Sequence, residues 1–307
     1  MGNALLAEGW DREPVQPLPT CTQLSLAKVQ LGRILFQDPR LSFNDSRSCA
    51  SCHPLERWGS DNLPLSQRAD GSLTELNTPT VYNVRYQIAQ FWNGRVRTLE
   101  EQAEEAIRIE MNKSWPELEQ KLAADSFYRE AFARIYHGKV QAVHIQNALA
   151  EFVRSLVLAN SRFDRYLRGE KEAISQLERE GYQLFKEIGC ASCHQGVNLG
   201  GNLYQKSGIF LDRRREGGWQ WAEHSHETQD RFRVTGNDED RQVFKVPSLR
   251  LVTRSAPYFH DGSVPTLEEA VHRMARMQLG RTLSRTDVAK LLAFLATLEG
   301  SLAGACP

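Results

Sequence analysis

The sequence predicts a mainly α-helical protein in which two similar domains follow one another, each with long loops between its helices. The pentapeptide Cys-Ala-Ser-Cys-His occurs twice, at Cys49–His53 and at Cys190–His194. A Gly-x-x-Leu-Phe segment precedes each copy, at Gly32–Phe36 and at Gly181–Phe185. A chain of 307 residues also has the length of about two ordinary domains. The predicted division is an N-terminal extension over 1–23, a first domain over 24–165 and a second domain over 166–307.

Apolar residues at helical spacing predict the helices of the first half. The first helix carries Leu31, Ile34 and Leu35 on one face and ends ahead of the first Cys-x-x-Cys-His motif. Ser114 followed by Glu117 is the pattern of a capping box, in which two side chains satisfy main-chain amides at the start of a helix. The other helices of this half are expected over residues 115–136 and 142–159.

The second half shows the same alternation of helices and loops. Thr266 with Glu269 predicts another capping box, and Ser284 opens a last helix that is expected to end at Gly300. The polar stretch over 212–242 is expected to be a surface loop. The apolar face of the helix before the second motif consists of Leu177, Leu184, Phe185 and Ile188.

The two Cys-x-x-Cys-His motifs predict covalently bound haem c. In this motif the two thiols bond to the vinyl groups of a haem, and the adjacent imidazole becomes the proximal iron ligand. Zinc is the rival, but zinc-binding Cys-x-x-Cys pairs usually lie within about 15–20 residues of each other. The much wider separation here favours two haem groups, with His53 and His194 as their proximal ligands. The expected attachment residues are Cys49, Cys52, Cys190 and Cys193.

Charge and hydropathy exclude several classes of function. The 38 basic and 38 acidic residues cancel, so neither nucleic acid nor an anionic membrane is an expected partner. No stretch approaches the roughly 20 apolar residues of a membrane span, and Met1–Trp10 lacks the basic region of a signal peptide. Because haem is attached to this motif outside the bacterial cytoplasm, we expect the processed form of an exported, periplasmic protein.

Two cysteines are left over once the haem motifs are assigned. Cys21 and Cys306 lie near opposite ends of the chain. In an oxidising compartment such thiols can pair, but a disulfide also requires that their Cα atoms come close together. The sequence leaves open whether these two cysteines form a disulfide or stay as free thiols.

Further segments form an ordered series between and after the haem motifs. They are Asn77–Thr80, Phe91–Arg95, Leu99–Ala103, Glu110–Met111, Val246–Arg250, Ala256–Gly262 and Met274–Gly280. With this series, the chain over about residues 24–300 resembles the bacterial diheme cytochrome c peroxidases and their relatives. The resemblance implies two cytochrome c-like domains, with a peroxidatic haem in the first and an electron-transfer haem in the second. It also implies reduction of hydrogen peroxide with electrons from a small redox protein (a c-type cytochrome or a cupredoxin), and a homodimer, as in many relatives.

The chain departs from the common pattern of this family on the distal side of the first haem. Family members of the common type place a histidine there, a short way beyond the motif. Here no histidine lies between His53 and His137, and the corresponding region is the segment Gln67–Gly71. We therefore expect the first haem to be open or water-ligated without prior reductive activation.

Splitting a peroxide bond also needs a group that moves protons near the distal face. By resemblance, Glu110 and Gln102 fill the distal glutamate and glutamine positions of the family. The interval between them is shorter than in the common pattern, and the usual proline between them is absent. Glu104 and Glu105 therefore stay as alternatives to Glu110.

The second haem has a different expected ligand set. By resemblance, Met274 is its distal ligand opposite His194, and a thioether ligand raises the potential of a haem. Met277 is the alternative ligand, and a methionine on an apolar helical stripe can also be ordinary core. Relatives that oxidise tryptophans of a partner protein carry tyrosine at this position, so methionine points away from that activity.

Other residues gain an expected role from the resemblance alone. Trp92 would lie between the haems as a relay for electrons. Asn77 and the main-chain oxygens of Ser255 and Pro257 correspond to a calcium site between the domains, and oxygen-only ligation suits calcium. His260 is expected to be a hydrogen-bonding residue near a haem edge rather than an iron ligand.

The sequence is compatible with three functions. The first is a periplasmic diheme peroxidase supplied by a one-electron donor. The second is an enzyme that oxidises residues of a partner protein through a high-valent state shared by both haems; the open first haem favours it and Met274 disfavours it. The third is an electron carrier without catalysis, which predicts two six-coordinate, low-spin haems.

Overall fold

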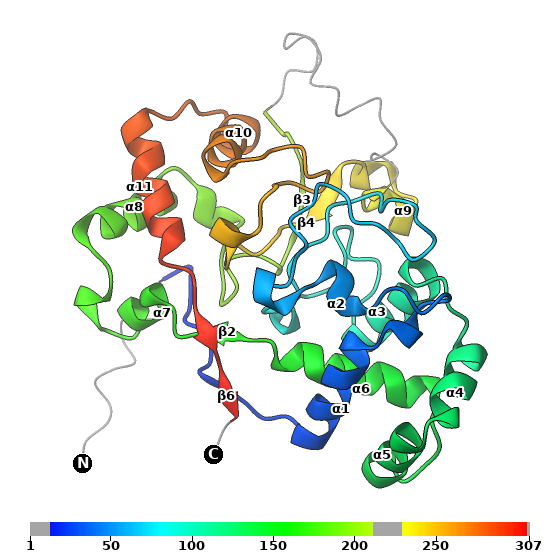
Figure 1. Cartoon of the computed structure of the whole chain (residues 1–307). Coiled ribbons are helices and arrows are strands. Elements are labelled where there is room, and N and C mark those ends of the chain that lie inside the picture. The colour runs from blue at the N-terminus through cyan, green and yellow to red at the C-terminus, as the bar shows by residue number, and fades with distance from the viewer. Residues whose placement is uncertain (1–12, 211–228, 306–307) are drawn as a thin grey trace, which may run out of the picture.

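The computed structural model describes residues 13–210 and 229–305. Helices α1 and α3 to α6 lie on one side of the molecule, and α7, α8, α10 and α11 lie on the other (Figure 1). No helix in these two ranges combines the length and the apolar character needed to cross a membrane. The helices are α1 (Leu26–Gln37), α2 (Cys49–Cys52), α3 (Leu99–Glu105), α4 (Trp115–Ala124), α5 (Ser126–Tyr136), α6 (Ala142–Ser155), α7 (Arg162–Leu167), α8 (Gln176–Glu187), α9 (Phe232–Thr235), α10 (Leu267–Leu279) and α11 (Arg285–Ala296). The strands are β1 (Cys21–Thr22), β2 (Leu158–Ala159), β3 (Tyr204–Lys206), β4 (Val243–Lys245), β5 (Ser301–Leu302) and β6 (Gly304–Ala305).

A tight helix crossing occurs once in each half, and a glycine makes it possible. Helix α1 crosses α6 at Gly32, where a Cβ atom would lie 1.9 Å from the carbonyl oxygen of Ala148. Helix α8 crosses α11 at Gly181, where a Cβ atom would lie 2.0 Å from the carbonyl oxygen of Lys290. No side chain fits at these distances, so the glycine of each Gly-x-x-Leu-Phe segment is required by the close approach of two backbones.

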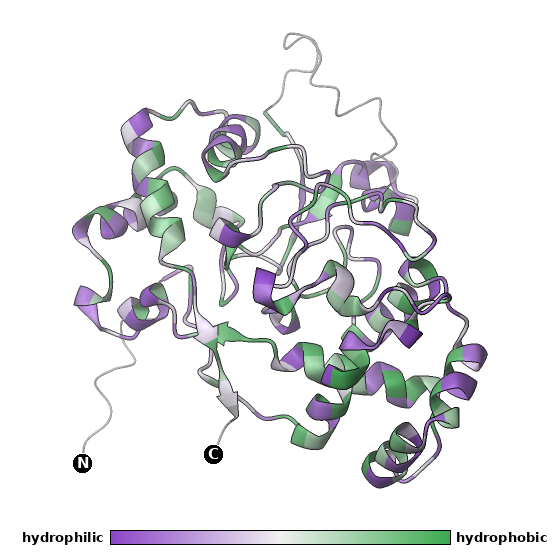
Figure 2. Ribbon diagram, in the orientation of Figure 1, coloured by the Kyte–Doolittle hydropathy of each residue, from purple (hydrophilic) through white to green (hydrophobic). Residues whose placement is uncertain are grey.

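The phenylalanine of the same segment anchors the hydrophobic core of its half. The ring of Phe36 lies 5.2 Å from that of Phe152 on α6, and the ring of Phe185 lies 5.1 Å from that of Phe294 on α11. Each pair belongs to a separate cluster of buried apolar residues. Figure 2 shows apolar residues along α6 and α11, where these helices meet their partners. The repeated segment thus reflects a repeated packing unit.

Short strand pairs hold together segments that lie far apart in the sequence. Strand β1 pairs in parallel with β6, and β2 pairs in antiparallel fashion with β5. Cys21, in β1, is disulfide-bonded. Cys306 lies outside the described residues. Strand β3 pairs with β4 beside the C-terminal haem motif.

The predicted helix over 115–136 is two helices, and its predicted capping box is absent. The side chain of Ser114 makes no capping hydrogen bond, and the Glu117 carboxylate lies 4.0 Å from the ammonium of Lys113. The helix is interrupted at Asp125, whose carboxylate accepts a hydrogen bond from the amide of Phe127 at 2.9 Å and so caps α5. Two apolar positions predicted to face the core, Ile34 and Leu177, are instead 43% and 48% exposed.

Two other predicted helix ends also differ from the structure. Helix α6 ends at Ser155 rather than 159, because the chain turns into β2, where Asn83 accepts a hydrogen bond from the Leu158 amide at 2.8 Å. Helix α11 ends at Ala296, and Gly300 lies instead against the main chain of β2. The capped start at Ser284 is confirmed. At Thr266 the side chain accepts from the amide of Glu269 at 3.2 Å, but the Glu269 carboxylate pairs with Arg273, so the predicted capping box is formed only in part. Of the predicted loop over 212–242, residues 212–228 lie outside the described part, and the rest contains the short helix α9.

Candidate haem sites

The first Cys-x-x-Cys-His motif opens onto a cavity of about 560 Å³ that Cys49, Cys52 and His53 help to line. The Nδ1 atom of His53 donates a hydrogen bond to the carbonyl oxygen of Gly59 at 2.9 Å. This bond fixes the ring and leaves Nε2 for a metal, as is usual for metal-bound histidines. The motif forms the single turn of α2, which Ser48 caps in a capping box with Ser51.

The second motif opens onto a cavity of about 380 Å³, lined by Cys190, Cys193, His194 and Met274. The Nδ1 atom of His194 donates to the carbonyl oxygen of Leu199 at 3.2 Å. Burial lowers the pKa of His194 to about 4, which keeps the imidazole in the neutral form that binds metals. Met274 therefore shares a cavity with the histidine that it is expected to face.

The chemistry of these residues fits haem c better than zinc. Burial raises the pKa of the Cys49 and Cys190 thiols to about 12 and that of Cys52 to about 11. These buried thiols are neutral in the absence of a bound group, and no group of three histidine, cysteine or acidic residues in the described ranges is placed to hold a zinc ion. Both cavity volumes also fall within the range of about 300–1,000 Å³ that is typical of cofactor sites.

Gln102 and Glu110 both line the first cavity. Gln102 comes from α3, and Glu110 ends the π-helical turn Ala106–Glu110 that follows α3. The Oε2 atom of Glu110 accepts a hydrogen bond from Nε of Arg68 at 2.8 Å. The carbonyl oxygen of Glu110 also accepts a hydrogen bond from the amide of Ala69 at 3.2 Å. The segment 67–71 therefore contacts Glu110 twice, with Arg68 bound to its side chain and Ala69 to its main chain.

The two alternative carboxylates differ in their positions. Glu104 accepts a hydrogen bond from Gln146 at 2.7 Å and is not among the residues that line the cavity. Glu105 lines the cavity and forms an ion pair with Arg95, as Glu110 does with Arg68. Glu105 therefore stays an alternative to Glu110, and Glu104 does not share their cavity.

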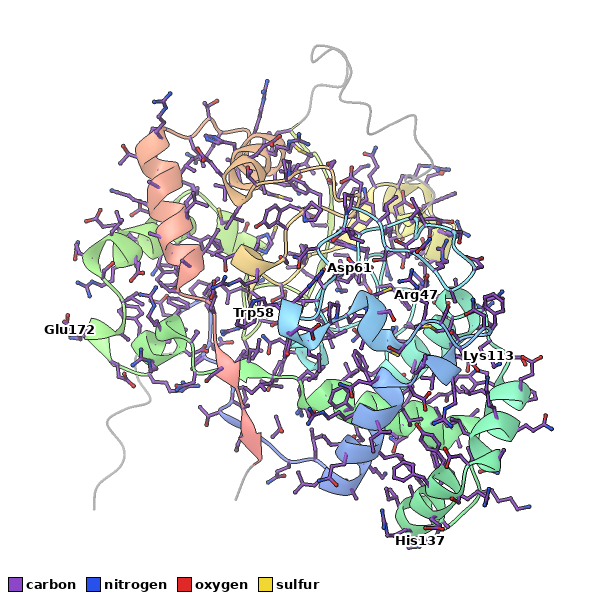
Figure 3. The ribbon with its side chains drawn as sticks, viewed as in Figure 1. Arg47, Trp58, Asp61, Lys113, His137 and Glu172 are labelled. Carbon is purple, nitrogen blue, oxygen red and sulfur yellow. The ribbon has the colours of Figure 1, made fainter. Side chains whose placement is uncertain are left out.

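The segment that replaces the distal histidine forms a closed hairpin. Gln67 and Leu73 form an isolated antiparallel bridge, and Arg47 donates a hydrogen bond to the side chain of Gln67. Figure 3 shows His137 at the outer end of α5, away from Arg47. Among the described residues that line this cavity, His53 is the one histidine.

The two cavities share one wall, formed by the segment Asn77–Thr80 together with Val84 and Gln90–Trp92, all of which line both cavities. The indole Nε1 of Trp92 donates a hydrogen bond to the carbonyl oxygen of Asn77 at 2.9 Å. The ring of Trp92 lies edge-on to that of His260, 6.3 Å away. Trp92 therefore lies between the two cavities, as expected of a relay.

Comparison with known proteins identifies the family of the chain. A profile of the di-haem cytochrome c peroxidase family matches residues 26–172, and a profile described as RoxA-like, cytochrome c-like matches residues 244–279. The cytochrome c551 peroxidase of Nitrosomonas europaea is 42% identical over 94% of this chain and 84% of that protein. The chain belongs to the di-haem cytochrome c peroxidase family. It is therefore an oxidoreductase whose cofactor is haem c. The family is one of enzymes and does not support the alternative of an electron carrier without catalysis.

Other relatives have names that indicate other functions. The methylamine utilization protein MauG of Methylophilus methylotrophus is 31% identical over 95% of this chain and 88% of that protein. A crystal structure of a MauG-like protein associated with microbial copper homeostasis superposes with a TM-score of 0.77, at 29% identity, covering 97% of this chain and 95% of the other. The mainly helical diheme fold that the sequence predicts is thus confirmed.

Within this peroxidase fold, an internal repeat extends beyond the haem motifs. The segments Phe91–Ala103 and Phe259–Val271 both contain Phe, Gly, Val and Thr-Leu-Glu-Glu at matching places. Phe91 and Phe259 both have left-handed backbone conformations, with φ of 65° and 70°, and each opens a hairpin bridge. At the same interval, Asn77 corresponds to Lys245, Trp92 to His260 and Ala106 to Met274.

The repeated segments interlock in a reciprocal way. The amide of Asn77 donates to the carbonyl oxygen of His260 at 2.8 Å, and the amide of Lys245 donates to the carbonyl oxygen of Trp92 at 2.8 Å. Each half therefore contributes the same pair of positions to the contact, as in an isologous interface.

The repeat also relates the distal positions of the two haem sites. Met274 lines the second cavity, and its counterpart Ala106 lines the first. An alanine methyl carries no atom that can bind iron. The same position in the fold thus offers a ligand in one half and none in the other.

The three residues expected at the calcium site line one cavity, that of the second motif. The Asn77 side chain donates through Nδ2 to the carbonyl oxygens of Leu63 at 2.8 Å and Pro64 at 3.3 Å. No described residue donates to its Oδ1 atom, which leaves that oxygen for a cation. Within the described ranges, no group of three histidine, cysteine or acidic residues is placed to hold a metal ion, so uncharged oxygens would have to do so.

Three site residues escaped the sequence analysis. Ala106 and Lys245 could have been found from the constant interval between the repeated segments. The contact of Arg68 with Glu110 leaves no signal in the sequence, because the two residues lie in different loops and turns.

Proposed function

We propose that the protein is a periplasmic diheme peroxidase that reduces hydrogen peroxide to water with electrons from a small redox protein, a c-type cytochrome or a cupredoxin. In this proposal residues 24–165 form the peroxidatic domain and residues 166–307 the electron-transfer domain. The observation that carries it is the pairing of Glu110 and Gln102 on one cavity with His53, where no described residue offers a second histidine.

Cys49, Cys52 and His53 would hold the haem of the peroxidatic site. When bound, the haem supplies a redox-active iron that delivers electrons to peroxide. Glu110 takes a proton from one peroxide oxygen and returns it to the other, and it does so through Oε1, because Arg68 occupies Oε2. Gln102 can donate a hydrogen bond that orients the peroxide. Complete reduction to two water molecules also consumes two electrons from the donor and two protons, which must reach the cavity from the solvent.

The second cavity supplies the electrons one at a time. Cys190, Cys193, His194 and Met274 would hold its haem, with the methionine as the distal ligand. Trp92 lies in the shared wall, and its hydrogen bond to Asn77 holds the indole in place. We assign Trp92 the role of a relay between the two haem groups.

A calcium ion held by Asn77, Ser255 and Pro257 is part of the same proposal. The support is that all three line the cavity of the second motif and that Asn77 turns its Oδ1 atom away from its two carbonyl partners. These oxygens come from both halves of the chain. Removal of calcium with a chelator is therefore expected to lower peroxide turnover, and its return is expected to restore it.

The test is steady-state peroxide reduction by the purified holoenzyme with a reduced c-type cytochrome and, separately, with a reduced cupredoxin. Rapid turnover with either donor supports the proposal, and negligible turnover with both overturns it. Trp92→Phe is expected to slow turnover at least about tenfold. Trp115→Phe is the matched control, because the Trp115 indole nitrogen is buried without a hydrogen-bond partner and the residue lines neither cavity.

A second candidate is oxidation of residues in a partner protein. The cavity without a second histidine and the 31% identity to MauG favour it, whereas Met274 disfavours it. Peroxide added to the holoenzyme without a donor distinguishes the two: the second candidate predicts a stored oxidising state that outlives the peroxide and modifies an added protein. The proposed peroxidase predicts rapid discharge by the redox protein.

A further inference from the structure

The cavity of the second haem motif has an unusual distribution of charge. Lys245 and Arg250 are the cationic side chains, besides histidine, among the described residues that line it, and none of those residues is acidic. Arg250 already has a counter-ion, because it donates to the Asp164 carboxylate at 2.8 Å and 3.1 Å. Both members of that pair are buried, with 2% and 0% exposure. Lys245 therefore differs from Arg250 in having no such partner.

Lys245 is a buried cation whose ammonium donates a hydrogen bond to a neutral group. It is 7% exposed at the end of β4, and its ammonium donates to the side-chain oxygen of Gln87. No carboxylate in the described part of the chain forms an ion pair with it. Burial lowers the pKa of Lys245 to about 8. An ammonium in such a place requires a counter-charge, since burying an unpaired ion is costly.

The backbone holds this lysine firmly at the cavity. Its amide donates to the carbonyl oxygen of Trp92 at 2.8 Å, and its Cα pairs with that of Tyr204 in the strand pair β3–β4. Two of the three ammonium protons are left over after the bond to Gln87. The cofactor of this cavity, haem c, carries two propionate carboxylates, which are the anions that the cavity walls themselves lack.

We propose that Lys245 binds a propionate carboxylate of the haem that Cys190, Cys193 and His194 hold. The proposal rests on haem attachment at the second motif and not on which reaction the enzyme performs. Such binding would change the reduction potential of that haem. A propionate without a counter-charge disfavours the extra electron of the ferrous state, whereas an ammonium beside it favours that electron. Lys245 thereby raises the reduction potential of the electron-transfer haem.

The experiment is a spectroelectrochemical titration of both haems in the holoenzyme, comparing the unaltered protein with Lys245→Met. We expect the reduction equilibrium of the second haem to fall at least about tenfold, which corresponds to about 59 mV for one electron. The first haem is expected to keep its potential. Lys245→Arg, which preserves the charge, should retain most of the unaltered value. Lys206→Met is the matched control, because Lys206 is exposed on the neighbouring strand β3 and does not line the cavity.

Equal potentials for the second haem in Lys245→Met and Lys206→Met overturn the proposal, and so does an equal shift of both haems. If Lys245→Met does not retain haem, redox-difference infrared spectra decide instead. Haem propionates labelled with ¹³C at their carboxyl carbons give bands that should differ between the unaltered protein and Lys245→Arg; identical bands overturn the proposal. Peroxide turnover is measured separately, so a protein without peroxidase activity can still show the expected potential shift.

Discussion

The guanidinium of Arg68 and the carboxylate of Glu110 meet at 2.8 Å on the cavity of the first haem motif. Arg68 also donates to the carbonyl oxygen of Leu73 at 2.6 Å, so one side chain closes the hairpin and holds the carboxylate at once. A charge-assisted hydrogen bond of this length is among the stronger ones in proteins. The segment from which the common distal histidine is missing therefore contributes to the site in another way, by holding Glu110.

Glu110→Gln is expected to lower kcat/KM for peroxide about 100-fold or more, because a general acid–base group contributes about 10²–10⁴-fold. Stopped-flow mixing of the holoenzyme with peroxide measures the effect. Glu104→Gln, whose side chain contacts Gln146 instead, should stay within about twofold of the unaltered enzyme. Similar rates for the two variants would contradict the role of Glu110.

Arg68→Gln is expected to lower kcat about tenfold with a smaller change in KM, because the residue positions Glu110 rather than touching the reacting atoms. Arg68→Lys should recover part of kcat, since it restores the charge but not the fork of the guanidinium. A purely structural role for Arg68 predicts instead that both variants lose activity in parallel with their loss of melting temperature.

Ala106→Met is expected to close the first haem site, because Ala106 is the counterpart of Met274 in the internal repeat. The high-spin ferric signal that we expect in the resting EPR spectrum should give way to a low-spin one, and peroxide reactivity should fall. Ala106→Leu has nearly the same volume but no sulfur, so it should keep the high-spin signal. The mirror-image change, Met274→Leu, should create a high-spin signal from the second haem.

Gly32→Ala and Gly181→Ala are each expected to destabilise the fold by at least about 2 kcal/mol, because the added methyl group meets a carbonyl oxygen at about 2 Å. Thermal unfolding monitored by circular dichroism measures the loss. At Gly138 the nearest atom to an added Cβ lies at 3.5 Å, so Gly138→Ala should have little effect. A melting temperature unchanged in both crossing variants would show that the helices can move apart freely.

Stability is expected to fall in acid partly through Asp38. Burial by itself would raise the pKa of Asp38, but hydrogen bonds from Arg40 and Tyr128 outweigh it and hold the pKa below its ordinary 3.8. A depressed carboxyl pKa stabilises the fold above about pH 4 and loses that contribution as the pH falls through the folded-state value.

Asp38→Asn should therefore cost about 1.5–3 kcal/mol at neutral pH, and the difference from the unaltered protein should narrow as the pH falls toward 3. Unfolding by urea at a series of pH values tests this. Asp238→Asn removes an exposed pair with Arg241 and should change little at any pH.

Part of the site could be predicted from short sequence motifs. A Cys-x-x-Cys-His pentapeptide by itself predicts covalent attachment of haem. Roles could be assigned to Glu110, Gln102, Trp92 and Met274 because a series of short segments resembled one family. The structure places these residues on the expected cavities, while their roles and the domain boundaries stay predictions. Contacts between residues of two distant segments, such as Arg68 with Glu110, could not be predicted from the amino-acid sequence.

The errors in the fold have a common physical cause. Periodicity predicted that 115–136 and 142–159 were helical, but it could not show where a competing hydrogen bond ends a helix. Asp125 and Asn83 each divert the main chain with one side-chain contact. The strand pairs of two residues are too short to leave an alternating pattern, and their partners lie far away in the sequence.

The wall that the two cavities share determines where peroxide and the electron donor would approach the proposed enzyme. The segment Asn77–Thr80 lines both cavities, so the thickness of a single chain separates them at that point. Oxidant and reductant can then be handled in separate compartments, with peroxide on one side and the docked donor on the other. In the proposed enzyme the donor would not have to meet peroxide, because electrons would cross the shared wall while the two reagents stay on opposite sides of it.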